Sequence, residues 1–391
     1  MPGADDNTLV FELEPIPTVS PSLAETLRNC PLQAALSRVS SIRGLVLGNP
    51  KAWLGTAYHE VLKKLWSPTG EVLTDDELVE HLWASAINTA RQRATAHPLN
   101  RRFAEPERWP GYCLARACVQ IRAQEALAEQ PRQAAITEAS GSSAATVREQ
   151  DLTAMNGKLA GKPDVVMDEE IRDYKSGRIY DETPDGTKTI KEAYVRQLHL
   201  YGHLVNETRG HCPRKGRLLP IQGETAEIDL HPEMCAAEAA EAVNLLDAFN
   251  TQLANASDAS DLATPSAAAC RWCQFKALCP AFWSTVNEDW AQELGSAAVC
   301  GVLKESPALI HNGRAFSITI AVRAGTTEAT DVTIAPVEKA VHGDLANLQV
   351  GDAVRIVNLY QRRNGQLAPT SATLCFREAD CPSFIPRGAA P

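Results

Sequence analysis

The stretch that decides the fold reads Gly161-Lys162-Pro163-Asp164 and then Asp173-Tyr174-Lys175, with eight residues between Asp164 and Asp173. Three strand-like runs surround it, at 146–154, 159–167 and 171–174. Asn156-Gly157 lies between the first two runs and is a typical hairpin turn. The pattern predicts an antiparallel meander that brings the two aspartates together.

The meander gathers charged side chains on one face. Residues two apart on a strand point to the same side, so Asp173 and Lys175 project together while the hairpin places Asp164 beside them. Carboxylate oxygens hold Mg²⁺ or Mn²⁺, the backbone carbonyl of Tyr174 can add a ligand, and an ammonium can orient water or counter a phosphate charge. Glu149 on the preceding strand supplies a third carboxylate. An ordinary surface hairpin with ion pairs remains the alternative.

Helical patterns flank the meander. Before it we expect an extended lead over 1–20, two short helices around Cys30-Pro31, and an α-helical insertion at about 60–130. Within that insertion, Thr74 and Glu77 form a capping-box pattern that opens a helix. After the meander we expect a helix at 194–205, a strand at 217–221 and a helix at 232–254. The mixture indicates an α/β domain.

The composition changes at about residue 296. Five short strands with glycines between them are expected at 302–309, 315–322, 331–336, 353–361 and 366–376. This pattern is typical of a small all-β barrel of the OB kind, and an SH3-like barrel stays open. Tyr360, Arg362 and Arg363 lie at one strand end, where they can stack on a base and contact phosphate, or form a plain solvated hairpin.

Cysteines form a second constellation. The chain has 11 of them, and three are closely spaced as Cys270, Cys273 and Cys279. With Cys30 they offer four sulfur ligands, for which zinc is a competitive occupant on chemistry alone. The other cysteines show no ligand spacing.

Four motifs in order resemble the PD-(D/E)xK nucleases and, in particular, their RecB-like branch. Asp164 with Asp173-Tyr174-Lys175 is similar to the catalytic core, Gly55 to His59 is similar to the helical G-x-x-x-H motif, and Gln197 to Tyr201 is similar to Q-x-x-x-Y. The resemblance implies a restriction-endonuclease-like mixed sheet flanked by helices. It makes His59 a metal ligand, which favours manganese, and lets Gln197 and Tyr201 position the nucleic acid. Glu138, upstream, is the alternative to Glu149 as third carboxylate.

The cysteine pattern resembles the iron-sulfur nucleases of that branch, including the AddB-type and CRISPR-adaptation nucleases. The resemblance implies a 4Fe-4S cluster held by Cys30, Cys270, Cys273 and Cys279, with zinc as the alternative. The cluster would connect the two ends of a nuclease domain over 21–295, which precedes an OB-like barrel over 296–391.

Charge and hydropathy narrow the classes of protein. The net charge of −10 excludes a basic protein that coats nucleic acid. No apolar run is long enough for a membrane span, and the first twenty residues carry no Lys or Arg, so we expect a cytoplasmic protein.

We therefore expect a metal-dependent DNA nuclease that hydrolyses phosphodiester bonds, with single-stranded DNA exonuclease activity in recombination, repair or defence. The alternatives are a DNA-end-binding or scaffold subunit that does not cut, and a nuclease active only in complex with a helicase or another protein that docks on the barrel.

Overall fold

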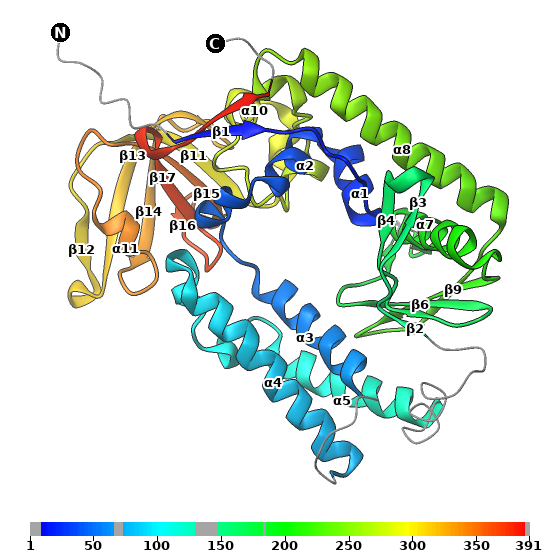
Figure 1. Cartoon of the computed structure of the whole chain (residues 1–391). Coiled ribbons are helices and arrows are strands. Elements are labelled where there is room, and N and C mark those ends of the chain that lie inside the picture. Colours follow the sequence, from blue (N-terminus) through cyan, green and yellow to red (C-terminus); the bar gives the residue numbers. More distant parts are fainter. Residues whose placement is uncertain (1–8, 66–72, 130–146, 183–184, 388–391) are drawn as a thin grey trace. The chain divides into compact units, whose positions relative to one another are not determined.

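The computed structural model describes residues 9–65, 73–129, 147–182 and 185–387. The chain forms two compact units (Figure 1). The first, here called the sheet unit, consists of Pro17–Glu25 and Gly48–Asp247. The second, the barrel unit, consists of Met1–Ile16, Thr26–Leu47 and Ala248–Pro391. Within the described residues, no helix is long and apolar enough to cross a membrane.

A mixed five-stranded sheet forms the centre of the sheet unit, in the order β10-β9-β6-β5-β2. Only β6 and β9 run parallel; the other neighbours are antiparallel. The strands are β2 (Val147–Arg148), β5 (Val165–Val166), β6 (Glu170–Lys175), β9 (Lys215–Pro220) and β10 (Ala226–Asp229). The mixed α/β class expected from the sequence is confirmed. Strand β6, which carries Asp173, and strand β5, which directly follows Asp164, are neighbours within the sheet.

The continuous meander expected from the sequence is wrong in its details. The run 146–154 divides into β2 and β3 (Leu152–Ala154), because Glu149 between them has a left-handed φ of 46°. The run 159–167 divides into β4 (Leu159–Gly161) and β5, with Pro163 in the gap, where it has no N–H for a strand ladder. Strands β3 and β4 pair with each other as a separate hairpin. A second hairpin, β7 (Tyr180–Glu182) with β8 (Lys188–Ile190), was not predicted.

The long helices lie largely where the sequence places them. The helices are α3 (Pro50–Lys64), α4 (Asp75–Ala96), α5 (Tyr112–Glu129), α7 (Glu192–Arg209) and α8 (Pro232–Asn255). The capping box at Thr74 and Glu77 is confirmed, with both reciprocal hydrogen bonds present. Helix α7 packs on β6 and β9, where Gly216 permits the approach: a Cβ there would lie 2.8 Å from a methyl of Leu198.

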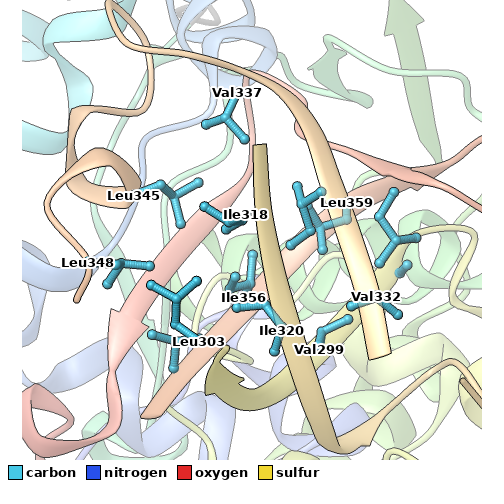
Figure 2. Close-up of a cluster of buried hydrophobic side chains, with 14 of the residues drawn as sticks. Val299, Leu303, Ile318, Ile320, Val332, Val337, Leu345, Leu348, Ile356 and Leu359 are labelled. Atoms are coloured by element: carbon cyan, nitrogen blue, oxygen red, sulfur yellow. The ribbon is translucent and has the colours of Figure 1, made fainter. Parts of the chain in front are cut away.

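The barrel unit contains a small closed barrel. Its ring of paired strands runs β11-β13-β14-β16-β15 and returns to β11. The strands of the unit are β1 (Val10–Leu13), β11 (Ala297–Leu303), β12 (Ala308–Ile310), β13 (Ala315–Gly325), β14 (Asp331–Glu338), β15 (Ala353–Gln361), β16 (Leu367–Ala368), β17 (Leu374–Arg377) and β18 (Ser383–Pro386). Figure 2 shows the buried aliphatic side chains that fill it, among them Ile318, Ile320 and Ile356.

Two of the five predicted barrel strands were wrongly bounded. The first begins at Ala297 and ends at Leu303, so most of 302–309 is a turn followed by β12. The run 366–376 divides into β16 and β17 around a turn in which Thr370 and Thr373 bond to the carbonyl of Asn358. The lead over 1–20 contains β1, which pairs in parallel with β18. The two helices expected around Cys30 are α1 (Pro21–Asn29) and α2 (Pro31–Arg38).

Candidate active site

The end of β6 carries the central charged pair. Asp173 and Lys175 lie on one face, and Lys175 Nζ lies 2.5 Å from Asp173 Oδ2. Asp173 is 3% exposed, so the pair is held away from bulk water. The parallel neighbour β9 pairs Asp173 with Leu218 and Lys175 with Pro220, which fixes the register of both side chains.

Asp164 reaches this pair through the backbone. Because Val165 is opposite Arg172 in the ladder, the preceding residue lies next to Asp173. Asp164 Oδ2 accepts a hydrogen bond of 2.6 Å from the amide of Tyr174. Two carboxylates and an ammonium therefore converge at the edge where β5 and β6 meet.

Helix α3 brings His59 to the same place. His59 Nδ1 lies 3.3 Å from Asp164 Oδ1, and the centre of the imidazole lies 5.8 Å from the ring centre of Tyr58 and 6.1 Å from that of Tyr174. Gly55 explains how the helix comes so close: a Cβ at this position would lie 2.5 Å from Cβ of Ser176, directly after β6. Gly55 of the predicted motif thus allows α3 to pack closely against the end of β6, and His59, one turn later, contacts Asp164.

Glu149 lies at the edge of this group. It lines a cavity of about 220 Å³ together with His59, Asp164 and Tyr174. Its carboxylate pairs with Lys63 of α3 at 2.5 Å, and its amide donates to the carbonyl of Asp164 at 3.1 Å. Its place as a third carboxylate stays a prediction, and Glu138 lies outside the described residues.

Helix α7 supplies polar side chains on the other side of Lys175. Gln197 Oε1 accepts from Lys175 Nζ at 2.5 Å, and Gln197 Nε2 donates to the hydroxyl of Tyr201 at 3.1 Å. Tyr194 was missed by the sequence analysis: Lys175 Nζ lies 4.5 Å from the centre of its ring. Its position three residues before Gln197, on the same helical face, is the signal that could have identified it.

Burial and neighbouring charges shift the ionisation of this group. Burial raises the pKa of Asp173 to about 6, opposed by Lys175 and assisted by Asp164. Burial alone would lower the pKa of His59, but the hydrogen bond and charge of Asp164 raise it above its ordinary value. The two carboxylates are thus held close to each other by a histidine and a lysine.

The donor set fits a divalent cation. Asp173 Oδ2 is fully buried and, apart from the ion contact with Lys175, has no hydrogen-bond partner among the described residues. A buried carboxylate is a hard oxygen ligand, so Asp173 suits a divalent cation that would share it with Lys175. In the described ranges no three His, Cys, Asp or Glu side chains are drawn together as one ion would require, so the donors form a hydrogen-bonded group and not a closed coordination shell.

The four predicted cysteine ligands meet in the barrel unit. Cys30, Cys270, Cys273 and Cys279 all line one cavity of about 350 Å³, whose other walls include Leu32, Leu36 and Phe282. Burial raises the pKa of Cys273 and of Cys279 to about 12. No ligand role was predicted for Cys212 and Cys235. Their sulfurs lie 4.0 Å apart in the sheet unit.

The predicted nucleic-acid contacts of the barrel lie at a hairpin. Tyr360 is the penultimate residue of β15 and has 60% of its surface exposed, and Arg362 and Arg363 follow in the turn. Arg362 bonds to Gln366 across this turn. The side chains are accessible from solvent and belong to the barrel unit.

Comparison with known proteins agrees with the geometry of the carboxylate group. No curated protein matches the chain. The family model of the PD-(D/E)XK nuclease superfamily matches residues 18–280, which include the charged residues around β6 and all four cysteines of the cavity. Two converging aspartates and a lysine at a strand end, within so long a match, identify the chain as a member of the PD-(D/E)XK nuclease superfamily.

Proposed function

We propose that this protein is a metal-dependent deoxyribonuclease that hydrolyses phosphodiester bonds of single-stranded DNA, as an exonuclease in recombination, repair or defence. The observation that carries the proposal is the connected group His59, Asp164, Asp173 and Lys175 at the end of β6. The proposal places this activity in the cytoplasm.

The metal ligands would be the two aspartates, His59 and the backbone carbonyl of Tyr174, with Glu149 as a further carboxylate. A bound Mg²⁺ or Mn²⁺ would supply positive charge to the attacked phosphate and lower the pKa of a water molecule. The Tyr174 amide fixes one oxygen of Asp164 by its hydrogen bond, which leaves the other oxygen facing His59. The protein thereby orients its ligands before the ion binds.

Lys175 would hold and orient the reacting groups. Its ammonium is fixed by Asp173 and by Gln197 and lies over the ring of Tyr194. A fixed ammonium can stabilise negative charge as it develops on the phosphate without moving during the reaction. Gln197 and Tyr201 then act as positioning residues for Lys175 and for the nucleic acid strand.

The cysteine cavity would hold a 4Fe-4S cluster. Four thiols from the α1–α2 joint and from 270–279 line one cavity, yet they do not converge as a lone ion requires within the described residues. The resemblance of the cysteine pattern to the iron-sulfur nucleases favours a cluster over a single zinc ion, the alternative. Its role would be structural, because it joins segments some 240 positions apart.

The proposed domains are a RecB-like, restriction-endonuclease-like nuclease over 21–295 and an OB-like barrel over 296–391. The barrel would guide DNA through Tyr360, Arg362 and Arg363, or bind a protein partner such as a helicase. Exposed aromatic and guanidinium groups at one strand end are the side chains that stack on unpaired bases and contact phosphates.

A cleavage assay tests the function. Anaerobically purified protein is given single-stranded DNA labelled at the 5′ or the 3′ end, with Mn²⁺, Mg²⁺ or EDTA, beside the variants Asp173→Ala and Asp173→Asn. We expect metal-dependent cleavage by the wild type alone, and the product ladder gives the polarity. Equal behaviour of wild type and variants with Mn²⁺ would refute the enzyme and favour a binding subunit. Activity that appears only with an added helicase would limit the proposal to a complex.

A further inference from the structure

Lys276 is a buried cation beside the cysteine cavity. It lies between Cys273 and Cys279, and only 3% of its surface is exposed. Its ammonium donates one hydrogen bond, to the carbonyl of Arg271 at 3.2 Å. Across the described parts of the chain, no carboxylate lies within ion-pair distance of it. Lysines are almost never fully buried unless they are paired.

The titratable groups that face Lys276 are the thiols of Cys273 and Cys270. Burial lowers its pKa to about 8, while Cys273 and Cys270 oppose this decrease. The carbonyl that accepts its hydrogen bond belongs to the residue directly after Cys270. Phe275, Ala277 and Leu278 around it are buried and apolar. A buried ammonium without a nearby anion is strongly unfavourable. We therefore expect a negative charge on the side of Lys276 that faces the cysteines.

A thiolate-ligated centre would supply that charge. Four thiolates around a 4Fe-4S core of charge 2+, or around Zn²⁺, carry a net charge of −2. When the cluster takes one electron, its net charge becomes −3 and no proton is needed. A fixed cation close by stabilises the anionic centre, and it stabilises the reduced form more than the oxidised form.

We propose that Lys276 is the counter-charge of the metal centre in this cavity, and that it raises the reduction potential of the cluster and slows loss of the metal. The inference rests on the proposed cluster and adds a residue that is not a ligand. Lys276 acts through the thiolates and is therefore a positioning residue.

A redox titration with dithionite as electron donor, followed by electron paramagnetic resonance of the anaerobic full-length protein, tests this role. The variants are Lys276→Met, which keeps the stem and removes the charge, and Lys276→Arg, which keeps the charge. Lys339→Met, at an exposed lysine of the barrel unit, is the matched control. For Lys276→Met we expect the ratio of reduced to oxidised cluster at a fixed potential to fall at least about tenfold, which is 59 mV for one electron. Lys276→Arg should remain within about threefold of the wild type, by the same scale.

Metal release to a chelator is the second readout. It should be about tenfold faster in Lys276→Met and unchanged in Lys339→Met, whether the metal is iron or zinc. If Lys276→Met has the reduction potential and the metal-release rate of the wild type, the proposed role of Lys276 is wrong and the proposed cluster is unaffected. A wild type purified without iron or zinc would overturn both. If Lys276→Met holds no metal, restoration in Lys276→Arg supports the charge, and failure of both variants overturns it.

Discussion

The carboxylate group at the end of β6 and the cysteine cavity of the barrel unit differ in how buried charge is compensated. Around Asp173 and Asp164 the protein supplies its own compensation: Lys175, His59 and a backbone amide contact the carboxylates. Around the four cysteines the walls are apolar, and Lys276 is buried without a carboxylate among the described residues. The carboxylate group is therefore held in place by the protein alone, whereas the cysteine cavity would need the proposed metal to be complete.

The largest expected effect separates the two sites by activity. Asp173→Asn keeps the shape of the side chain but removes the charge that faces Lys175 and the metal, so cleavage should fall by at least about 1,000-fold. Iron content should stay at the wild-type level, because all four cysteines belong to the other compact unit. A labelled-DNA assay and iron analysis of one preparation check both. Loss of iron together with activity would show that the two sites are not independent.

The reverse experiment removes a ligand of the proposed cluster. Cys273→Ser should abolish iron binding and lower the melting temperature of the barrel unit by about 10 °C, since 1 kcal/mol corresponds to about 2–4 °C in a unit of this size. Cys212→Ser is the matched control, since that cysteine lies in the sheet unit. Calorimetry with and without EDTA completes the contrast, because removal of Mg²⁺ should leave the sheet unit's transition in place. A large EDTA-induced loss there would contradict preassembly.

The close approach of Gly55 to Ser176 offers a test with a smaller expected effect. Gly55→Ala places a methyl group against Ser176, and we expect a loss of about 1–3 kcal/mol in unfolding free energy together with weaker metal binding through His59. Gly44→Ala is the control, since a Cβ there meets nothing within 4 Å. Adding Ser176→Gly to Gly55→Ala should restore most of the loss. Denaturant titration measures it, and the absence of restoration would place the strain elsewhere.

The smallest effect is a dependence on pH. Burial raises the pKa of Asp173 to about 6 in the folded protein, whereas an unfolded aspartate titrates near about 4. The native state therefore holds this proton more tightly, and the contribution of Asp173 to stability is fully present below about pH 4 and lost as pH rises through about 6. Metal-free wild type should lose stability across this window relative to Asp173→Asn. Parallel slopes for the two proteins would show that Asp173 is ionised in both states.

Much of the helical architecture could be predicted because its signals are local. The capping box at Thr74 and the proline after Cys30 identify helix starts without reference to the rest of the chain. The ends of the strands in the meander could not be predicted, because they depend on the left-handed backbone of Glu149 and on Pro163 within a strand pattern. β7, β8 and β10 were missed since they are short and have few apolar residues.

The candidate site could be predicted in its residue types but not in its contacts. The motifs indicated Asp164, Asp173, Lys175, Gln197 and His59, yet the pairing of Lys175 with Gln197 and the ring of Tyr194 arises only when α7 packs on β6. Lys276 is a similar case. A lysine between cysteines reads as exposed, and only the packing of Phe275 and Leu278 around it shows its burial. The spacing of residues along the sequence does not reveal contacts between segments that are far apart in the chain.

The parallel pairing of β1 with β18 has a consequence for synthesis on the ribosome. Glu14 and Arg387, at the ends of this pair, are bonded across 373 positions of the chain. At about 5–20 residues per second, β1 must wait roughly 20 to 75 s for its partner to be made. The sheet unit's long segment, Gly48–Asp247, is complete well before that. Translation therefore imposes an order of assembly in which the five-stranded sheet forms first and the pairing of β1 with β18 forms later.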